Sequence, residues 1–121
     1  MAKTALVVDD STSMRQMVTF TLQSSGFDTI ESINGADALA KSDAQPIDIV
    51  ITDLNMPEMD GITLIKQLRA KPAFQYTPIL LLTTESQDAK KQEGKAAGAT
   101  GWMVKPFNPD QLMAIVKKVV R

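Results

Sequence analysis

Polar and charged side chains that could do chemistry come directly after the apolar segments of the chain. They are Asp9, Asp10, Thr52, Asp53, Thr83, Thr84 and Lys105. Each has an ordinary explanation on its own, since acids and threonines after a strand are commonly turn residues and most lysines are solvated. If the apolar segments are parallel strands, however, these residues lie at one edge of the sheet, where ligands bind in such folds. Their convergence favours a functional site.

Three carboxylates at this edge, from Asp9, Asp10 and Asp53, would repel one another. Two unit charges ~4 Å apart cost about 4 kcal/mol at an effective dielectric constant of about 20. A divalent cation relieves the repulsion, and an all-oxygen ligand set suits Mg²⁺ rather than zinc. With Lys105 and a threonine hydroxyl beside one carboxylate, the group suits phosphoryl transfer, in which the carboxylate is the nucleophile and the cations take up charge on the phosphoryl oxygens.

The composition excludes several other kinds of site. The 121 residues include no Cys and no His, which removes thiolate zinc sites, cysteine nucleophiles, His–metal sites and imidazole catalysis. Any phosphohistidine in the reaction therefore belongs to another protein. The 13 basic and 14 acidic residues leave a net charge of −1, without the basic excess typical of a nucleic-acid-binding protein.

Five apolar segments are the candidate strands that position these residues. Phe27 opens an alternating segment over 27–31, which indicates a half-exposed strand. The other four are continuous runs, typical of strands buried on both faces of a parallel sheet. They cover 5–8, 49–51, 79–82 and, more weakly, 102–104.

Helical periodicity fills the intervals between these strands. The five helices are predicted around 14–22, 36–40 after the Asn34-Gly35 turn, 62–68, 87–97 and 112–119. Their predicted end signals are Ser11 or Thr12 and Gly26 for the first helix, Ser86 for the fourth, and Asn108 with Pro109 for the fifth. The fourth helix has no large apolar residue, and Gly94 costs it roughly 1 kcal/mol relative to Ala, which favours a weakly held, movable element.

Strand–helix alternation predicts an α/β fold with a doubly wound parallel sheet of five strands and five helices. We expect residues 1–121 to form one domain with no output domain, since no linker or repeat divides the chain. The apolar run near the N-terminus is too short for a signal peptide, and no segment reaches the ~20 apolar residues of a membrane span. We therefore expect a cytoplasmic protein with no membrane or nucleic-acid partner.

Four motifs in this chain resemble those of the receiver domain of two-component response regulators. They are 7–10 (Val-Val-Asp-Asp), 53–61 (Asp-Leu-Asn-Met-Pro-Glu-Met-Asp-Gly), 82–84 (Leu-Thr-Thr) and 105–107 (Lys-Pro-Phe). The match covers essentially the whole chain. Within the family, the chain most resembles single-domain CheY-type chemotaxis regulators. The resemblance implies the CheY-like, flavodoxin-like strand order 2-1-3-4-5.

The resemblance also implies a role for each matching residue. Asp53 would be the phosphorylation site, with catalytic help from Thr83 and Lys105 and a cis Lys105–Pro106 bond. The Mg²⁺ ligands would be Asp10 and Asp53 through their side chains, Asn55 through its backbone carbonyl and Asp9 through a water molecule. The Thr84 amide would reach the phosphoryl oxygens. Asn55 and Glu85 would tune hydrolysis, and Thr83 and Trp102 would form the switch, with Trp102 in place of the family's usual Tyr or Phe.

The partners implied by the resemblance are a CheA-like histidine kinase and a downstream protein. The kinase would donate the phosphoryl group, and a monomeric regulator would present its fourth helix, fifth strand and fifth helix to the target, such as a flagellar motor switch. The alternatives are a receiver in a non-chemotaxis phosphorelay and a phosphate sink.

Three other functions fit the sequence less well. A flavodoxin-like electron carrier needs a phosphate-binding loop after the first strand, where Asp9 and Asp10 would repel phosphate. A phosphatase of the haloacid dehalogenase type needs a second acid two residues after its nucleophile, where Asn55 stands. An inactive receiver is expected to lose an acid or the lysine, and neither is lost.

Overall fold

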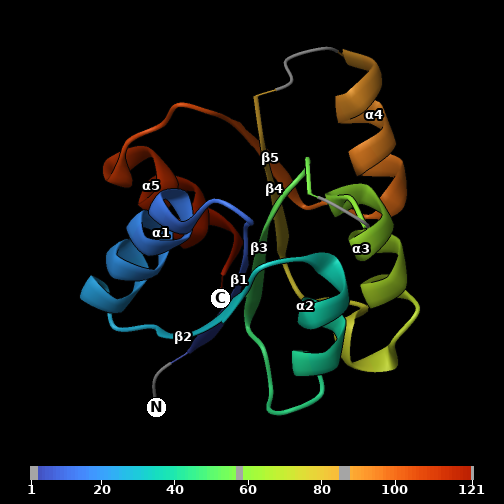
Figure 1. Cartoon of the computed structure of the whole chain (residues 1–121), viewed down its shortest axis with the longest axis horizontal. Helices are drawn as coiled ribbons and strands as arrows, with labels where there is room; N and C mark the ends of the chain where they lie inside the picture. The colour runs from blue at the N-terminus through green and yellow to red at the C-terminus, as the bar shows by residue number, and fades with distance from the viewer. Residues whose placement is uncertain (1–2, 57–58, 85–87, 121) are drawn as a thin grey trace.

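The computed structural model describes residues 3–56, 59–84 and 88–120, and within them five strands alternate with five α-helices (Figure 1). The strands are β1 (Thr4–Val8), β2 (Asp28–Ser32), β3 (Ile49–Asp53), β4 (Ile79–Thr83) and β5 (Gly101–Val104). The helices are α1 (Thr12–Ser24), α2 (Gly35–Lys41), α3 (Gly61–Arg69), α4 (Asp88–Ala97) and α5 (Pro109–Val119), with a short 3₁₀ turn, η1 (Pro72–Phe74). All neighbouring strands are parallel, in the order β2-β1-β3-β4-β5. The predicted fold class and strand order are confirmed.

Helices cover both faces of the sheet, with α1 and α5 on one side and α2, α3 and α4 on the other (Figure 1). Alternate residues of a strand face opposite sides, so each central strand supplies two cores. Leu6 and Leu81, for example, pack with the α3 side chains, whereas Val7 and Leu82 pack with α1 and α5. This explains why the central strands are continuous apolar runs, whereas the edge strand β5 is only partly buried.

Polar caps set the starts of the helices near the positions that the sequence predicts. The Ser11 hydroxyl accepts a hydrogen bond from the Met14 N–H, and Asn108 forms a reciprocal capping box with Gln111. Gly26 follows α1 with φ of +93°, a conformation that side-chain-bearing residues rarely adopt. The predicted cap Ser86 and the helical residue Gln87 lie outside the described residues.

Gly94 of α4 lies against Leu81 of β4 and Trp102 of β5. A Cβ at this position would lie 2.9 Å from Leu81 Cδ2 and 3.4 Å from Trp102 Cζ3. The glycine therefore has a packing reason that helix propensity alone does not reveal. It lets a helix without large apolar residues rest directly on β4 and β5.

We expect Gly94→Ala to lower the free energy of unfolding by about 1 kcal/mol, although alanine favours the helix. The helical gain is about 1 kcal/mol, whereas forcing a methyl group into a packed contact costs roughly 1–3 kcal/mol. Urea unfolding measures the difference, and Trp102 emission should shift because the new methyl group contacts the ring. Gln92→Ala, at an exposed position of α4, is the control. A more stable Gly94→Ala protein with unchanged emission would show that the contact is loose.

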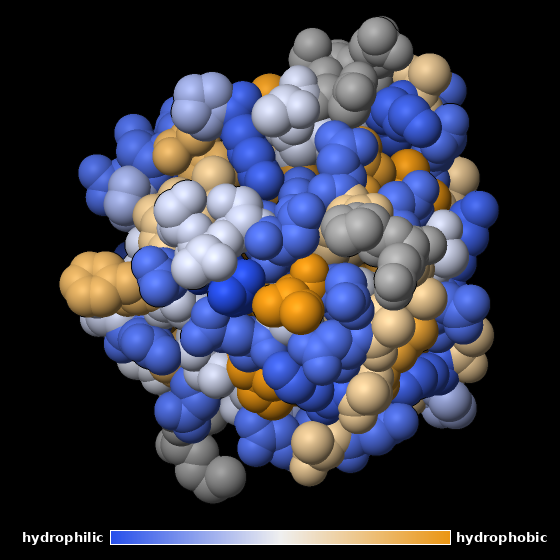
Figure 2. Space-filling model, viewed as in Figure 1, coloured by the Kyte–Doolittle hydropathy of each residue, from blue (hydrophilic) through white to orange (hydrophobic). Residues whose placement is uncertain are grey.

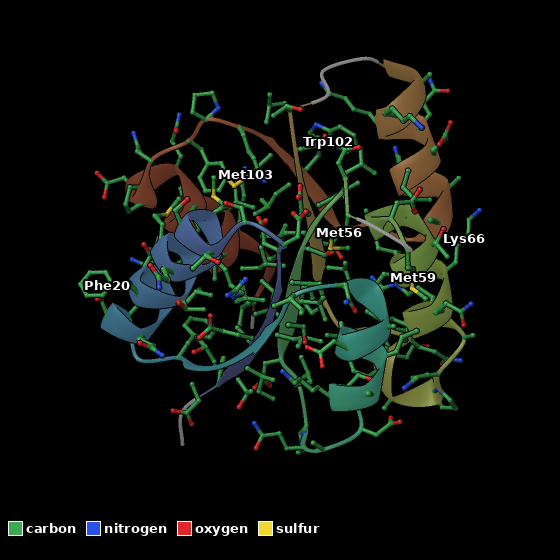
Figure 3. All side chains as sticks on the ribbon, viewed as in Figure 1. Phe20, Met56, Met59, Lys66, Trp102 and Met103 are labelled. Atoms are coloured by element: carbon green, nitrogen blue, oxygen red, sulfur yellow. The ribbon has the colours of Figure 1, made fainter. Side chains whose placement is uncertain are left out.

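The surface in the view of Figure 2 is mainly hydrophilic, with small separate apolar patches. Phe20 on α1 is 71% exposed and points away from the domain (Figure 3). Among the described helices, none combines the length and the hydrophobicity needed to cross a membrane.

Candidate functional site

Three carboxylates gather at the carboxyl edge of the sheet, as the sequence predicts. Asp9 follows β1, Asp10 comes next, and Asp53 is the last residue of β3, which pairs with β1. Each carboxylate offers one oxygen, and these oxygens all lie within 4.8 Å of one another. Asp9 and Asp53 are buried, whereas Asp10 is exposed, so the group opens to solvent on one side.

Lys105, just after β5, brings a positive charge to the two buried acids. Its Nζ donates to Asp53 Oδ1 at 3.1 Å and to Asp9 Oδ2 at 3.3 Å. The Lys105 side chain is only 15% exposed, so solvent screens these contacts poorly. The Lys105–Pro106 peptide bond is cis, as the resemblance implies.

The electrostatics of the site are centred on Asp53. Burial raises the pKa of Asp53 above its ordinary value, and the negative charges of Asp9 and Asp10 raise it further. The Lys105 ammonium opposes this by its charge and its hydrogen bond. The net pKa shift is upward, so the lysine compensates only part of the cost of the ionised Asp53 carboxylate.

The donor set fits a hard divalent cation. Oxygen atoms from three carboxylates meet at an opening, and Mg²⁺ prefers oxygen ligands and retains several water molecules. A cation there would offset the repulsion that raises the pKa of Asp53. The arrangement therefore joins a buried carboxylate that could act as a nucleophile, a lysine and oxygen atoms that could hold a metal ion.

The threonines predicted for the site lie at the end of β4, next to β3. Thr83 is fully buried and pairs in register with Val104, whereas Thr84 is exposed just beyond the strand. Asn55 is exposed two residues after Asp53. The predicted tuning residue Glu85 lies outside the described residues.

Trp102 lies beside α4 (Figure 3). It pairs in register with Leu81 and packs against the same core cluster, two residues from the Thr83–Val104 pair. Its indole Nε1 is buried and has no hydrogen-bond partner among the described residues. An unsatisfied buried donor costs roughly 1–3 kcal/mol, so a conformation that supplies an acceptor would be favoured.

Arg15 is a residue of this region that sequence reasoning missed. Its Nη1 donates to the Asp9 carbonyl at 2.9 Å, and its Nε donates to Glu31 Oε1 at 2.9 Å. The available signal was weak, because an arginine in the first turn of a helix is ordinarily solvated. Its contact with the acidic turn depends on the side chain folding back over that turn.

A family model described as the response regulator receiver domain matches residues 5–117. The chemotaxis protein CheY1 of Helicobacter pylori strain J99 is 42% identical over 109 residues, with 88% of each chain covered. The Bacillus subtilis alkaline phosphatase synthesis transcriptional regulatory protein PhoP is 37% identical over 121 residues. The chain spans about half the length of PhoP and of the Enterococcus gallinarum regulatory protein VanRc.

Comparison with solved structures points to the same family. The chemotaxis response regulator CheY4 of Vibrio cholerae superposes with a TM-score of 0.95 at 48% identity. The superposition covers 99% of this chain and 100% of that one. A likeness of this extent includes the whole sheet and both helical layers.

Proposed function

Because the chain belongs to the response regulator receiver family, we propose that it is a signalling switch activated by phosphorylation of Asp53 in a Mg²⁺-dependent reaction. The observation that carries this proposal is the placement of Lys105 Nζ 3.1 Å from Asp53 Oδ1 within a group of three carboxylates. That arrangement supplies a nucleophile, a fixed positive charge and oxygen ligands at one opening.

In the proposed reaction, a carboxylate oxygen of Asp53 attacks the phosphorus of a phosphohistidine. The P–O bond to Asp53 forms as the P–N bond to the imidazole breaks, and the imidazole leaves with the bonding electron pair. The chain has no histidine, so the donor is a partner histidine kinase. Lys105 pairs with the phosphoryl oxygens, and the Thr83 hydroxyl and Thr84 amide also donate to them.

Mg²⁺ would be held by Asp10, Asp53 and the Asn55 carbonyl, with Asp9 acting through a water molecule. When bound, it neutralises negative charge that builds up on the phosphoryl oxygens. Asn55 would influence how fast water reaches the phosphorylated Asp53; its exposure two residues from the acceptor supports this role. The same tuning role is proposed for Glu85.

The output that fits best is chemotaxis, because the relatives include CheY1 and CheY4. The phosphorylated protein, as a monomer, would change its affinity for a target, such as a flagellar motor switch, through α4, β5 and α5. PhoP and VanRc belong to the same set of relatives, so a receiver in another phosphorelay is the second candidate.

The experiment that tests the proposal is intact-mass analysis after treatment with acetyl phosphate. We expect one phosphoryl group per chain in the presence of Mg²⁺ and almost none with a metal chelator. Peptide mapping should place the group on the segment that contains Asp53. Metal-independent labelling, or labelling at another residue, would contradict the proposal.

Thr83→Ala should reduce the response of Trp102 to activation severalfold. Thr83 shares a strand face with Leu81, which pairs with Trp102, so movement of its hydroxyl toward the phosphoryl group would change the packing around the ring. The measurement is the change in Trp102 emission when beryllofluoride is added to the Mg²⁺-loaded protein. Thr84→Ala, which keeps the backbone N–H, should respond normally. A normal response in Thr83→Ala would exclude that hydroxyl from the coupling.

A further inference from the structure

Asp9 and Asp10 are adjacent in one turn, but hydrogen bonds restrain Asp9 far more than Asp10. Asp9 donates its N–H to the Ser32 carbonyl at 3.1 Å. Its carboxylate accepts from the Ser11 N–H at 2.9 Å and from Lys105. Asp10, by contrast, is exposed, and its carboxylate makes no hydrogen bond or ion pair within the described parts of the chain. Its direction therefore depends on the backbone that carries it.

Arg15 acts on that backbone. The Asp9 carbonyl, which accepts from Arg15 Nη1 at 2.9 Å, belongs to the peptide unit that joins Asp9 to Asp10. Because a peptide unit is planar, a hydrogen bond to its oxygen restricts the rotation of the whole unit. That rotation determines where the Asp10 Cα–Cβ bond points.

Glu31 fixes the position of the guanidinium. Its Oε1 accepts from Arg15 Nε at 2.9 Å, so Arg15 connects α1, β2 and the acidic turn. The Arg15 side chain is only 14% exposed, whereas that of Glu31 is 47% exposed, so the guanidinium is packed against the domain while the glutamate end of the pair opens to solvent. The planar guanidinium presents its donors in a fixed geometry that lysine does not reproduce.

From these contacts we infer that Arg15 is a positioning residue for the cation site and raises its affinity for Mg²⁺ by aiming the Asp10 carboxylate at it. The inference rests on the proposed Mg²⁺ site, and it assigns Arg15 no contact with the ion.

Simple electrostatics makes the opposite prediction. A positive charge close to a cation site repels the cation, so removing Arg15 should strengthen Mg²⁺ binding if charge alone matters. If Arg15 positions Asp10, its removal should weaken binding despite the more negative site. The sign of the effect therefore separates the two explanations.

The test measures the Mg²⁺ dissociation constant by titration calorimetry at constant ionic strength, with Mg²⁺ as the only ligand. Arg15→Gln should weaken binding about tenfold, the lower end of what residues that orient metal ligands contribute. Arg15→Lys keeps the positive charge but loses the fixed donor geometry of the guanidinium, and it should weaken Mg²⁺ binding about threefold. The lysine variant also carries the test if the glutamine variant folds poorly, which urea unfolding would show.

A double-mutant cycle with Asp10→Asn separates positioning from a general loss of structure. Once Asp10 is no longer a carboxylate, replacing Arg15 should change the dissociation constant less than about twofold, because the two effects act through the same ligand. Unchanged or tighter binding in Arg15→Gln, or additive losses in the double variant, would overturn the inference while leaving the metal site intact. If Asp10→Asn itself binds Mg²⁺ as wild type does, both the inference and the proposed ligand set are wrong.

Discussion

Asp53→Asn is expected to reduce labelling by acetyl phosphate at least about a hundredfold, because a neutral amide is a poor nucleophile in place of a carboxylate. The measurement is the phosphorylated fraction by intact mass in Mg²⁺. Asp53→Ala should give the same loss.

Asp60→Asn is the matched control for this loss. The Asp60 side chain is exposed and caps α3 by accepting from the Thr63 N–H at 2.8 Å. Asparagine is an equally good N-cap, so this variant should fold and be labelled as wild type. Equal labelling of Asp53→Asn and wild type would remove Asp53 from the role of acceptor.

Asp53→Asn should also stabilise the metal-free protein. The pKa of Asp53 in the folded state is raised above its ordinary value of 3.8, chiefly by burial. At pH values between the unfolded-state pKa and the folded-state pKa, the folded state therefore binds more protons than the unfolded state. The free energy of unfolding therefore falls as pH rises through that window, and the cost is fully present above it. In chelator at neutral pH, Asp53→Asn should be more stable by on the order of 1 kcal/mol, with the difference lost in acid. Urea unfolding across pH measures this.

The sequence predicts the fold well because its evidence is local and repeated. Two kinds of signal are short-range: the buried apolar runs over 5–8, 49–51 and 79–82, and the helix caps at Ser11 and Asn108. Each involves residues close together in the sequence, so it can be recognised without knowledge of the tertiary structure. The meeting of Asp9, Asp53 and Lys105 is predicted in addition, because the carboxyl ends of parallel strands share an edge.

The features that the sequence does not reveal depend on particular side-chain contacts across elements. Helix propensity treats Gly94 as a cost, whereas the structure shows α4 resting on Leu81 and Trp102 at that position. The contact of Arg15 with the Asp9 carbonyl has no sequence signature, since the same arginine is equally compatible with a solvated helix face. Such contacts require the rotamers as well as the topology.

Lys105→Met is expected to lower the free energy of unfolding of the metal-free protein by about 2–3 kcal/mol at neutral pH. The substitution keeps much of the apolar stem but removes the ammonium that contacts Asp53 at 3.1 Å and Asp9 at 3.3 Å. Those side chains are 8% and 2% exposed, so their charges would be left buried without compensation. Removing one partner of a buried ion pair costs more than the pair itself contributes.

The control for this loss is Lys90→Met in α4. Lys90 pairs with Glu93 at 3.5 Å, and the two side chains are 43% and 54% exposed. A pair of this kind contributes less than about 0.5 kcal/mol, so the control should unfold almost as wild type does. Equal losses in the two lysine variants would show that the buried contacts of Lys105 have no special weight.

Two conditions should reverse the loss in Lys105→Met. Acid protonates the unpaired carboxylates, so the difference from wild type should shrink as pH falls, and Mg²⁺ should reduce it at neutral pH by supplying positive charge to the same oxygens. Adding Asp53→Asn should also recover part of the lost stability, because one of the repelling charges is then absent. A loss that neither acid, Mg²⁺ nor Asp53→Asn relieves would mean that Lys105 stabilises the fold by packing. Lys105 would then not be the cation that balances the acceptor site.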